Sequence, residues 1–150
     1  MDEQKLLEVA RGSVEAFNGR DWDRFRSTLA PNAVYDEVGS GRKRTGRDDI
    51  LETIKGWTQA FSDVEGTIDH TVVSGDTAIL EITYRGTHDG TLEGPAGSVG
   101  PTGKTIATRC VEVVRISDGL IVENRNYFDM LGMLKALGVF PASAAQQAGA

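Results

Sequence analysis

Apolar positions in the first 60 residues repeat with the period of an α-helix. The spacing predicts an amphipathic helix that ends at Asn18-Gly19, a short helix capped by Asp21, and a third helix that ends near residue 61. Thr45 and Asp48 fit a capping box at the start of the third helix. The predicted apolar faces are Leu6, Ala10, Val14 and Phe17; Trp22, Phe25 and Leu29; and Ile50, Ile54, Trp57 and Phe61.

From residue 64 onward the hydrophobic period changes to two, the period of a β-strand. The alternation predicts long strands over residues 64–74, 78–88, 104–116 and 120–127, after an earlier short strand over 33–38. Helices followed by a meander of strands indicate an α+β fold, a curved antiparallel sheet with the N-terminal helices packed on its concave face. Because long twisted strands bend, we expect a cone with an interior that can hold a ligand.

The length of 150 residues is typical of one domain. We expect residues 1–140 to form this domain, with a last helix over about 130–137, and residues 141–150 to form a flexible tail of small side chains. The glycine-rich stretch 89–103 is interpreted as a connection over the mouth of the cone, either a lid or a merely permissive loop.

Composition and charge narrow the range of partners. A formal net charge of −6 argues against a nucleic-acid partner, whose phosphates need a basic face. No apolar run approaches the roughly 18 residues of a membrane span, and no basic leader precedes an apolar stretch, so we expect a cytoplasmic protein without a membrane partner. Cys110 is the single cysteine, which excludes an intrachain disulfide.

Short motifs along the chain occur in the order found in a known superfamily. They are FNGRDW at 17–22, GTHDG at 86–90, PTGK at 101–104, SDGLIVE at 117–123, YFD at 127–129 and LKALG at 134–138. Through them, residues 5–140 resemble the SnoaL-like polyketide cyclase branch of the nuclear-transport-factor-two-like (ketosteroid-isomerase-like) superfamily. The resemblance implies a cone-shaped α+β barrel, often a homodimer, that holds small hydrophobic molecules.

The same resemblance implies several chemistries, which include aldol cyclisation of polyketide esters, ketosteroid isomerisation, epoxide hydrolysis and dehydration. We therefore expect an enzyme without a cofactor that uses a carboxylate general acid/base on a hydrophobic carbonyl compound, as a cyclase or isomerase does. One alternative is a non-catalytic protein that binds a small hydrophobic ligand, because this fold does not determine function. Another is a protein–protein module that uses the outer face of the sheet.

Asp129 is the first candidate for catalysis. The resemblance implies a general acid/base at the end of the last strand, and a carboxylate at the mouth of an apolar cone would have a raised pKa. The same position also suits the N-cap of the following helix, so both roles stay open. His88 is the second candidate, because a histidine at the rim could polarise a carbonyl or relay a proton. The alternative is a hydrogen-bonded histidine at the end of a strand.

Four further residues are expected to contact substrate from the first strand and the third helix. Tyr35 and Asp36 lie on the short strand, which often borders the pocket in this superfamily, and Asp36 could act as a second carboxylate. A solvated edge strand is the alternative. Trp57 and Phe61 lie on the inner face of the third helix, where they serve as core, as ligand contacts, or as both.

Two more substrate contacts are predicted on the last two strands. Arg109 and Glu112 interrupt the apolar pattern of residues 104–116, and an inward Arg109 could hold an enolate, whereas an outward one would pair with an acidic neighbour. Tyr127 shares a strand face with Asp129. No metal site is expected, since His70 and His88 lack a clear third ligand.

Overall fold

A six-stranded curved sheet forms one side of the protein, and the computed structural model describes it within residues 2–94 and 97–139. The strands lie in the order β2-β1-β8-β7-β4-β3. Neighbouring strands are antiparallel except β1 and β8, which are parallel, so the sheet is mixed rather than wholly antiparallel. The bounds are β1 Leu29–Glu37, β2 Arg42–Thr45, β3 Glu65–Ser74, β4 Thr77–Thr87, β7 Thr105–Ser117 and β8 Leu120–Phe128.

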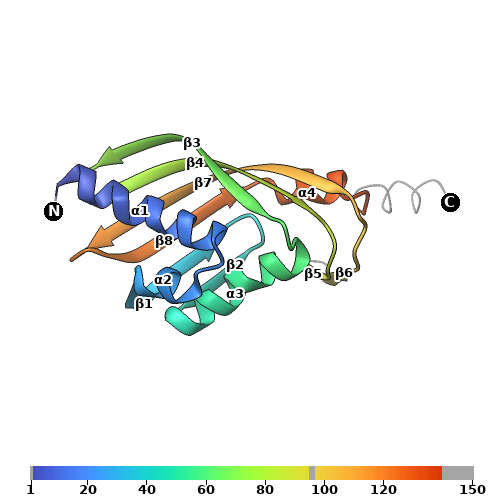
Figure 1. The fold of residues 1–150 in the computed structure, drawn as a ribbon, viewed down its shortest axis with the longest axis horizontal. Helices are drawn as coiled ribbons and strands as arrows, with labels where there is room; N and C mark the ends of the chain where they lie inside the picture. The colour runs from blue at the N-terminus through green and yellow to red at the C-terminus, as the bar shows by residue number, and fades with distance from the viewer. Residues whose placement is uncertain (1, 95–96, 140–150) are drawn as a thin grey trace.

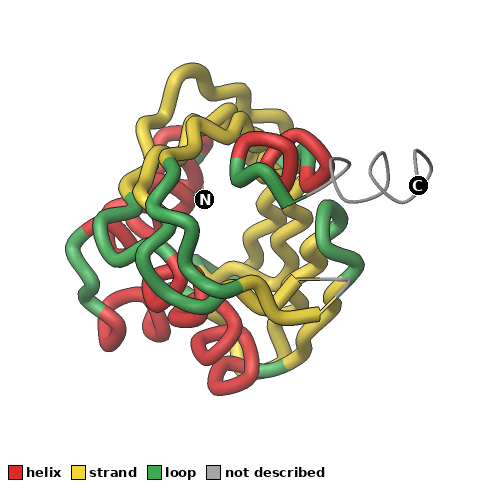
Figure 2. Tube along the Cα trace, turned by 90° about the vertical axis from the view of Figure 1, so that its right-hand side faces the viewer, coloured by secondary structure: helices red, strands yellow, loops and turns green. Residues whose placement is uncertain are grey.

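Three N-terminal helices cover the concave side of this sheet (Figure 1), and a fourth helix follows β8. Figure 2 looks along the long axis and shows strands and helices arranged around a common centre. The α+β architecture predicted from the alternation and the helical spacing is confirmed. The helices are α1 Glu3–Asn18, α2 Trp22–Ser27, α3 Arg47–Ala60 and α4 Met130–Ala136.

The helix starts follow the expected capping rules at α2 but not at α3. The Asp21 carboxylate accepts a hydrogen bond from the Arg24 backbone N–H at 3.1 Å, as predicted. Helix α3 instead begins after Gly46, at a φ of 93° and without a side-chain cap. The predicted capping box is therefore wrong: Thr45 is the last residue of β2, and Asp48 forms an ion pair with Arg26 at 3.0 Å.

The core lies between the helices and the concave face of the sheet. Side chains from both layers are almost fully buried there, and the alternation along β4 and β7 sends every second residue into this layer. The most deeply buried apolar residues include Ala10, Ile50, Phe61, Leu80, Val114 and Ile121.

The glycine-rich stretch contains a small hairpin, β5 Leu92–Gly94 and β6 Gly97–Val99, that is anchored to the end of α3. The Asp89 carboxylate accepts hydrogen bonds from the backbone N–H and the hydroxyl of Ser62. A Cβ at Gly90 would lie 2.0 Å from the Gln59 carbonyl oxygen, so only glycine fits this approach. The predicted tail over 141–150 lies outside the described residues.

Candidate active site

The space between the helices and the sheet holds a cavity of about 90 Å³. The helices contribute mainly apolar side chains, such as Val14, Phe25, Ile54 and Phe61. The polar lining comes largely from strands β1, β4, β7 and β8, and Trp57 of α3 adds to it. The strand residues are Tyr35, Glu37, Tyr84, Thr108, Cys110, Glu112, Asn124 and Asn126.

Strand register explains why polar side chains gather on one wall. Along a strand, every second side chain faces the same way. Tyr35 of β1 lies opposite Asn124 of β8, and Glu112 of β7 lies opposite Asn126. Three neighbouring strands therefore present their inward polar residues to the same part of the cavity.

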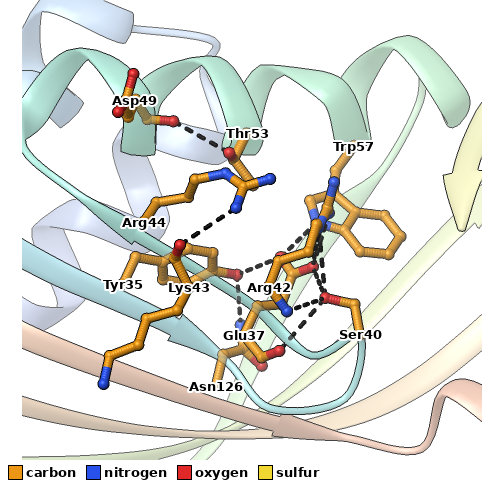
Figure 3. Close-up of polar contacts among 10 residues, drawn as sticks. All are labelled: Tyr35, Glu37, Ser40, Arg42, Lys43, Arg44, Asp49, Thr53, Trp57 and Asn126. Carbon is orange, nitrogen blue, oxygen red and sulfur yellow. Dashed lines mark hydrogen bonds and ion pairs between the residues drawn. The ribbon is translucent and has the colours of Figure 1, made fainter. Parts of the chain in front are cut away.

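Glu37 is the centre of a hydrogen-bond network on the β1 side of the cavity (Figure 3). Its side chain has no solvent exposure, and Arg42 forms an ion pair with Oε1 at 2.7 Å. The Ser40 hydroxyl also donates to Oε1, while the Tyr35 hydroxyl and the Trp57 indole N–H donate to Oε2 at 2.8 and 2.9 Å. A buried charge with these partners is well compensated, so Glu37 acts as a structural anion.

Glu112 is a second buried carboxylate on the same cavity wall, with much poorer compensation. Asn124 Nδ2 donates to Oε1 at 2.7 Å, and the Tyr84 hydroxyl donates to Oε2 at 3.1 Å. Within the described part of the chain it forms no ion pair. Loss of hydration on burial raises the pKa of Glu112, and the two neutral donors offset this only in part.

The neighbouring groups remain protonated. Burial, with Glu37 nearby, raises the pKa of the Tyr35 hydroxyl, and burial beside Glu112 raises that of Tyr84. Burial also raises the pKa of the Cys110 thiol, which donates to Asn126 Oδ1 at 2.7 Å. Glu112 is thus the cavity carboxylate whose pKa is raised toward the range that suits proton transfer.

Three of the residues predicted from the sequence line this cavity: Tyr35, Trp57 and Phe61. The Trp57 ring stacks on Phe61 with a centroid distance of 6.4 Å and meets Phe128 edge-on at 5.8 Å. The two aromatic residues of α3 therefore serve as core and as cavity wall together, as the sequence allowed.

The prediction that Asp129 faces the dry interior is wrong. Asp129 is exposed and caps α4, where its carboxylate accepts a hydrogen bond from the Gly132 N–H at 2.8 Å. Alternation along β8 sends Asn124, Asn126 and Phe128 inward, and Tyr127, 41% exposed, faces outward. A catalytic role for Asp129 therefore has no support from its position.

His88 is fully buried but does not line the cavity. Its Nδ1 accepts a hydrogen bond from the Thr102 N–H at 3.2 Å and lies 3.0 Å from the Thr102 hydroxyl, while the ring packs at 5.2 Å on Phe61. Burial lowers the pKa of His88. These contacts hold residues 101–104 against the end of β4, which is a structural role.

Asp36 and Arg109 are also absent from the cavity lining. Asp36 lies between the inward Tyr35 and Glu37, so the alternation of β1 turns it to the outer face, where it is half-buried. Arg109 is exposed on the outer face of β7. Asp36, Arg109 and Tyr127 therefore do not line this cavity, and their substrate contacts remain predictions.

Sequence reasoning missed the two asparagines and gave too little weight to the two glutamates. The sequence did contain one signal for Glu112. It interrupts an apolar strand, and the alternation places it on the same strand face as Cys110 and Val114, which are buried. Glu37 had no such signal, since its cation and its indole partner come from other elements.

In the described residues no group of three His, Cys, Asp or Glu side chains could hold a metal ion. No helix in that part of the chain is long and apolar enough to span a membrane.

Solved structures with this architecture include nuclear-transport-factor-two-like and ketosteroid-isomerase-like proteins. A candidate SnoaL-like polyketide cyclase from Jannaschia sp. CCS1 aligns over 93% of this chain and 94% of its own, with 21% identity and a TM-score of 0.82. IdmH, a candidate polyketide cyclase from Streptomyces antibioticus, aligns over 89% and 99%, with 30% identity and a TM-score of 0.76. AclR, a candidate hydroxylase from Streptomyces galilaeus, aligns over 93% and 89%, with 25% identity and a TM-score of 0.79.

The family follows from the sequence match. Residues 7–137 match the SnoaL-like polyketide cyclase family, and the chain belongs to that family. The resemblance predicted from the short motifs is confirmed. The comparison with curated proteins gave no match.

Proposed function

We propose that the protein catalyses proton transfer on a small hydrophobic carbonyl compound held in the cavity, as a polyketide cyclase or an isomerase does. The observation that carries this proposal is Glu112, a buried carboxylate with a raised pKa on the wall of a largely apolar cavity. A carboxylate of this kind is matched to proton transfer near neutral pH. Membership of the SnoaL-like family and the likeness to IdmH support the same class of reaction.

The proposed reaction begins when ionised Glu112 removes a proton from a carbon next to the carbonyl group. The C–H electron pair moves into an enolate, and the proton remains on the Glu112 carboxyl group. In an isomerisation, Glu112 returns that proton to a different carbon. In an aldol cyclisation, the enolate carbon attacks a second carbonyl of the same molecule, and the resulting alkoxide oxygen receives the proton.

Neighbouring donors would stabilise the enolate oxygen. Once Glu112 carries the proton, Tyr84 no longer faces a charged acceptor and its hydroxyl can turn toward the enolate. Asn126 Nδ2 has two protons and makes one long contact of 3.3 Å with the Tyr35 hydroxyl. The second proton is therefore suited to a carbonyl oxygen. One such preset donor typically lowers the activation free energy by about 2.7–4 kcal/mol.

The test is deuterium exchange from D₂O into small cyclic ketones, followed by proton NMR. Wild-type protein is expected to accelerate exchange, and Glu112→Gln to lower the accelerated rate by about 100-fold or more. Glu81→Gln is the matched control, because Glu81 is an exposed carboxylate on the outer face of β4. Equal rates in wild type and Glu112→Gln, with folding verified by circular dichroism, would falsify the proposal.

A binding protein without catalysis is the second candidate, and one observation favours it. Both oxygens of Glu112 and both oxygens of Glu37 already accept hydrogen bonds, so the acidic groups of the cavity are satisfied within the protein. Native mass spectrometry of the purified protein separates the two cases. A ligand that co-purifies unchanged, together with no ketone exchange, would favour the binding protein.

A further inference from the structure

Helix α3 carries a polar stripe that does not line the cavity. Each residue of this stripe lies three or four positions from another, which is the spacing of one side of a helix. They are Asp49, Glu52, Thr53, Gly56 and Gln59. The stripe lines an outer groove of about 940 Å³, whose other walls are residues 42–45 of β2 and residues 91–93 at the start of the β5–β6 hairpin. Trp57 is the one described residue that lines both the groove and the cavity, so α3 separates the two spaces.

Gly56 lies within this stripe and has open space above it. A Cβ built at Gly56 would have no atom within 4 Å, whereas a Cβ at Gly12 in α1 would lie 3.4 Å from Arg24 Nη2. Glycine inside a helix makes the helix less stable than alanine does. The backbone of Gly56 is helical, so neither its conformation nor a described neighbour requires glycine there. A side chain at this position would extend into the groove, and its absence leaves the helix backbone open to a ligand.

The groove presents side chains of both charge signs that do not pair with one another. Asp49 and Glu52 of α3 and Arg44 of β2 form no ion pair in the described part of the chain. Arg44 points from β2 toward α3 (Figure 3), and its Nη1 donates a hydrogen bond to the Lys43 carbonyl at 3.2 Å. An anion in the groove would face the two carboxylates, and a cation would face the guanidinium. A hydroxyl group suits both, because it donates and accepts hydrogen bonds.

We propose that the outer groove is a second binding site, which takes a neutral, hydroxyl-rich group such as a sugar ring. The ring lies against the open backbone at Gly56, and its hydroxyls bridge the carboxylates of α3 and the guanidinium of Arg44. Two sources supply such a group: a free sugar, or a sugar attached to the compound in the cavity, since Trp57 lines both spaces. The site is separate from Glu112 and does not depend on proton transfer.

The experiment is an NMR titration of the isotope-labelled full chain with methyl β-D-glucopyranoside, methyl β-D-galactopyranoside and myo-inositol. At least one of these is expected to shift the Trp57 indole N–H and Gly56 amide signals in a saturable way. Trp22, the other tryptophan, lines neither the groove nor the cavity and serves as the internal control. Its indole signal should stay in place.

Gly56→Ala separates a ligand site from a structural role for the glycine. The added methyl group should raise the melting temperature by about 2–4 °C, because alanine favours the helix. The same methyl group blocks the groove, so the dissociation constant of the best neutral ligand should rise about tenfold or more. A loss of binding in a more stable protein cannot come from misfolding. Gly12→Ala is the matched control and should leave the dissociation constant unchanged.

Two further comparisons define the ligand. Methyl β-D-glucuronide and glucosamine add a negative and a positive charge, and both are expected to bind more weakly than the best neutral ligand. A glucoside of an aromatic ketone, 4-acetylphenyl β-D-glucopyranoside, distinguishes the two sources. Binding about tenfold tighter than that of methyl β-D-glucopyranoside assigns the groove to a sugar attached to the cavity ligand. Equal affinity assigns it to a free sugar.

Four results overturn the inference. They are no saturable shift with any neutral ligand, tighter binding of a charged analogue, a dissociation constant that Gly56→Ala leaves unchanged or Gly12→Ala raises equally, and a lower melting temperature for Gly56→Ala. Ketone exchange by the wild-type protein tests the proposed function alone. Exchange without sugar binding removes only the groove site, and sugar binding without exchange removes only the proton-transfer proposal.

Discussion

Two buried carboxylates on one cavity wall show how partners, rather than burial alone, decide what a charge does. Glu37 at the end of β1 has a cation and three further side-chain donors around it, and Arg42 lies opposite it in the β1–β2 pairing. Among the described residues, Glu112 in the middle of β7 has only Tyr84 and Asn124 as side-chain donors, both neutral. The first carboxylate holds an ion pair and a hydrogen-bond network together, and the second is suited to exchange a proton.

The largest expected effect comes from removing the well-compensated carboxylate. Glu37→Ala leaves Arg42, Trp57 and Tyr35 without their acceptor, and we expect a loss of about 3–5 kcal/mol in the free energy of unfolding. Asp36→Ala on the outer face of the same strand should change it by no more than about 0.5 kcal/mol. Urea denaturation measures both, and similar losses for the two variants would contradict the comparison.

The next effect concerns the pH dependence of catalysis at Glu112. Only the ionised carboxylate can remove a proton, so the exchange rate should rise about tenfold per pH unit below its pKa and level off above it. Because burial raises the pKa of Glu112, the midpoint should lie above the value of 4.5 for a free glutamate. A midpoint at or below 4.5 would show that Glu112 is not the base.

Trp57→Phe tests one neutral donor of the Glu37 network. The change removes the indole N–H that donates to Glu37 at 2.9 Å but keeps an aromatic ring beside Phe61 and Phe128. We expect a loss of about 1.5–3 kcal/mol, the range for a hydrogen bond to a charged group. Thermal and urea unfolding should agree on this value, and an unchanged stability would mean that the bond contributes nothing.

Asp129 offers a smaller test outside the cavity wall. Asp129→Ala should cost about 1 kcal/mol through loss of the α4 cap, and Asp129→Asn should recover most of it, since asparagine caps equally well. Ketone exchange should be unaffected by Asp129→Asn. A large drop in the exchange rate of this variant would restore the catalytic role that the family resemblance implies for this position.

At low pH, Glu112→Gln should change the free energy of unfolding less than any of the other variants. As pH rises, Glu112→Gln should stabilise the protein, whereas Glu37→Ala destabilises it. The folded-state pKa of Glu112 lies above the unfolded value, so its stabilising contribution is present at low pH and is lost as pH rises through the folded pKa. Glutamine has no such loss. The variant should therefore gain stability relative to wild type as pH rises above 4.5, the ordinary pKa of a glutamate, and a difference that stays constant from that pH upward would contradict the raised pKa.

Local periodicity was enough to predict the helices and the long strands of the fold, but not β2 or the β5–β6 hairpin. The helical spacing up to Phe61 and the alternation after it identified α1 to α3 and the four long strands within a few residues, because these periods depend on neighbouring residues alone. The capping box at Thr45 failed because β1 pairs with residues 42–45 and draws them into β2. Pairing partners distant in the chain override such local signals.

The alternation of β8 also separated Asn124, Asn126 and Phe128 from Tyr127 and Asp129 correctly. Which of the two sets faces the cavity depends on the side of the sheet that the helices cover, and that is a property of the tertiary structure. The same limit applied to Arg109 and Glu112, two polar interruptions of opposite parity in one strand. The sequence by itself determined the elements, the family and the sets of residues that share a face. Only the packing of helices against the sheet decided that Glu112, with Asn124 and Tyr84, and not Asp129, lies where hydration is lost and a pKa can rise.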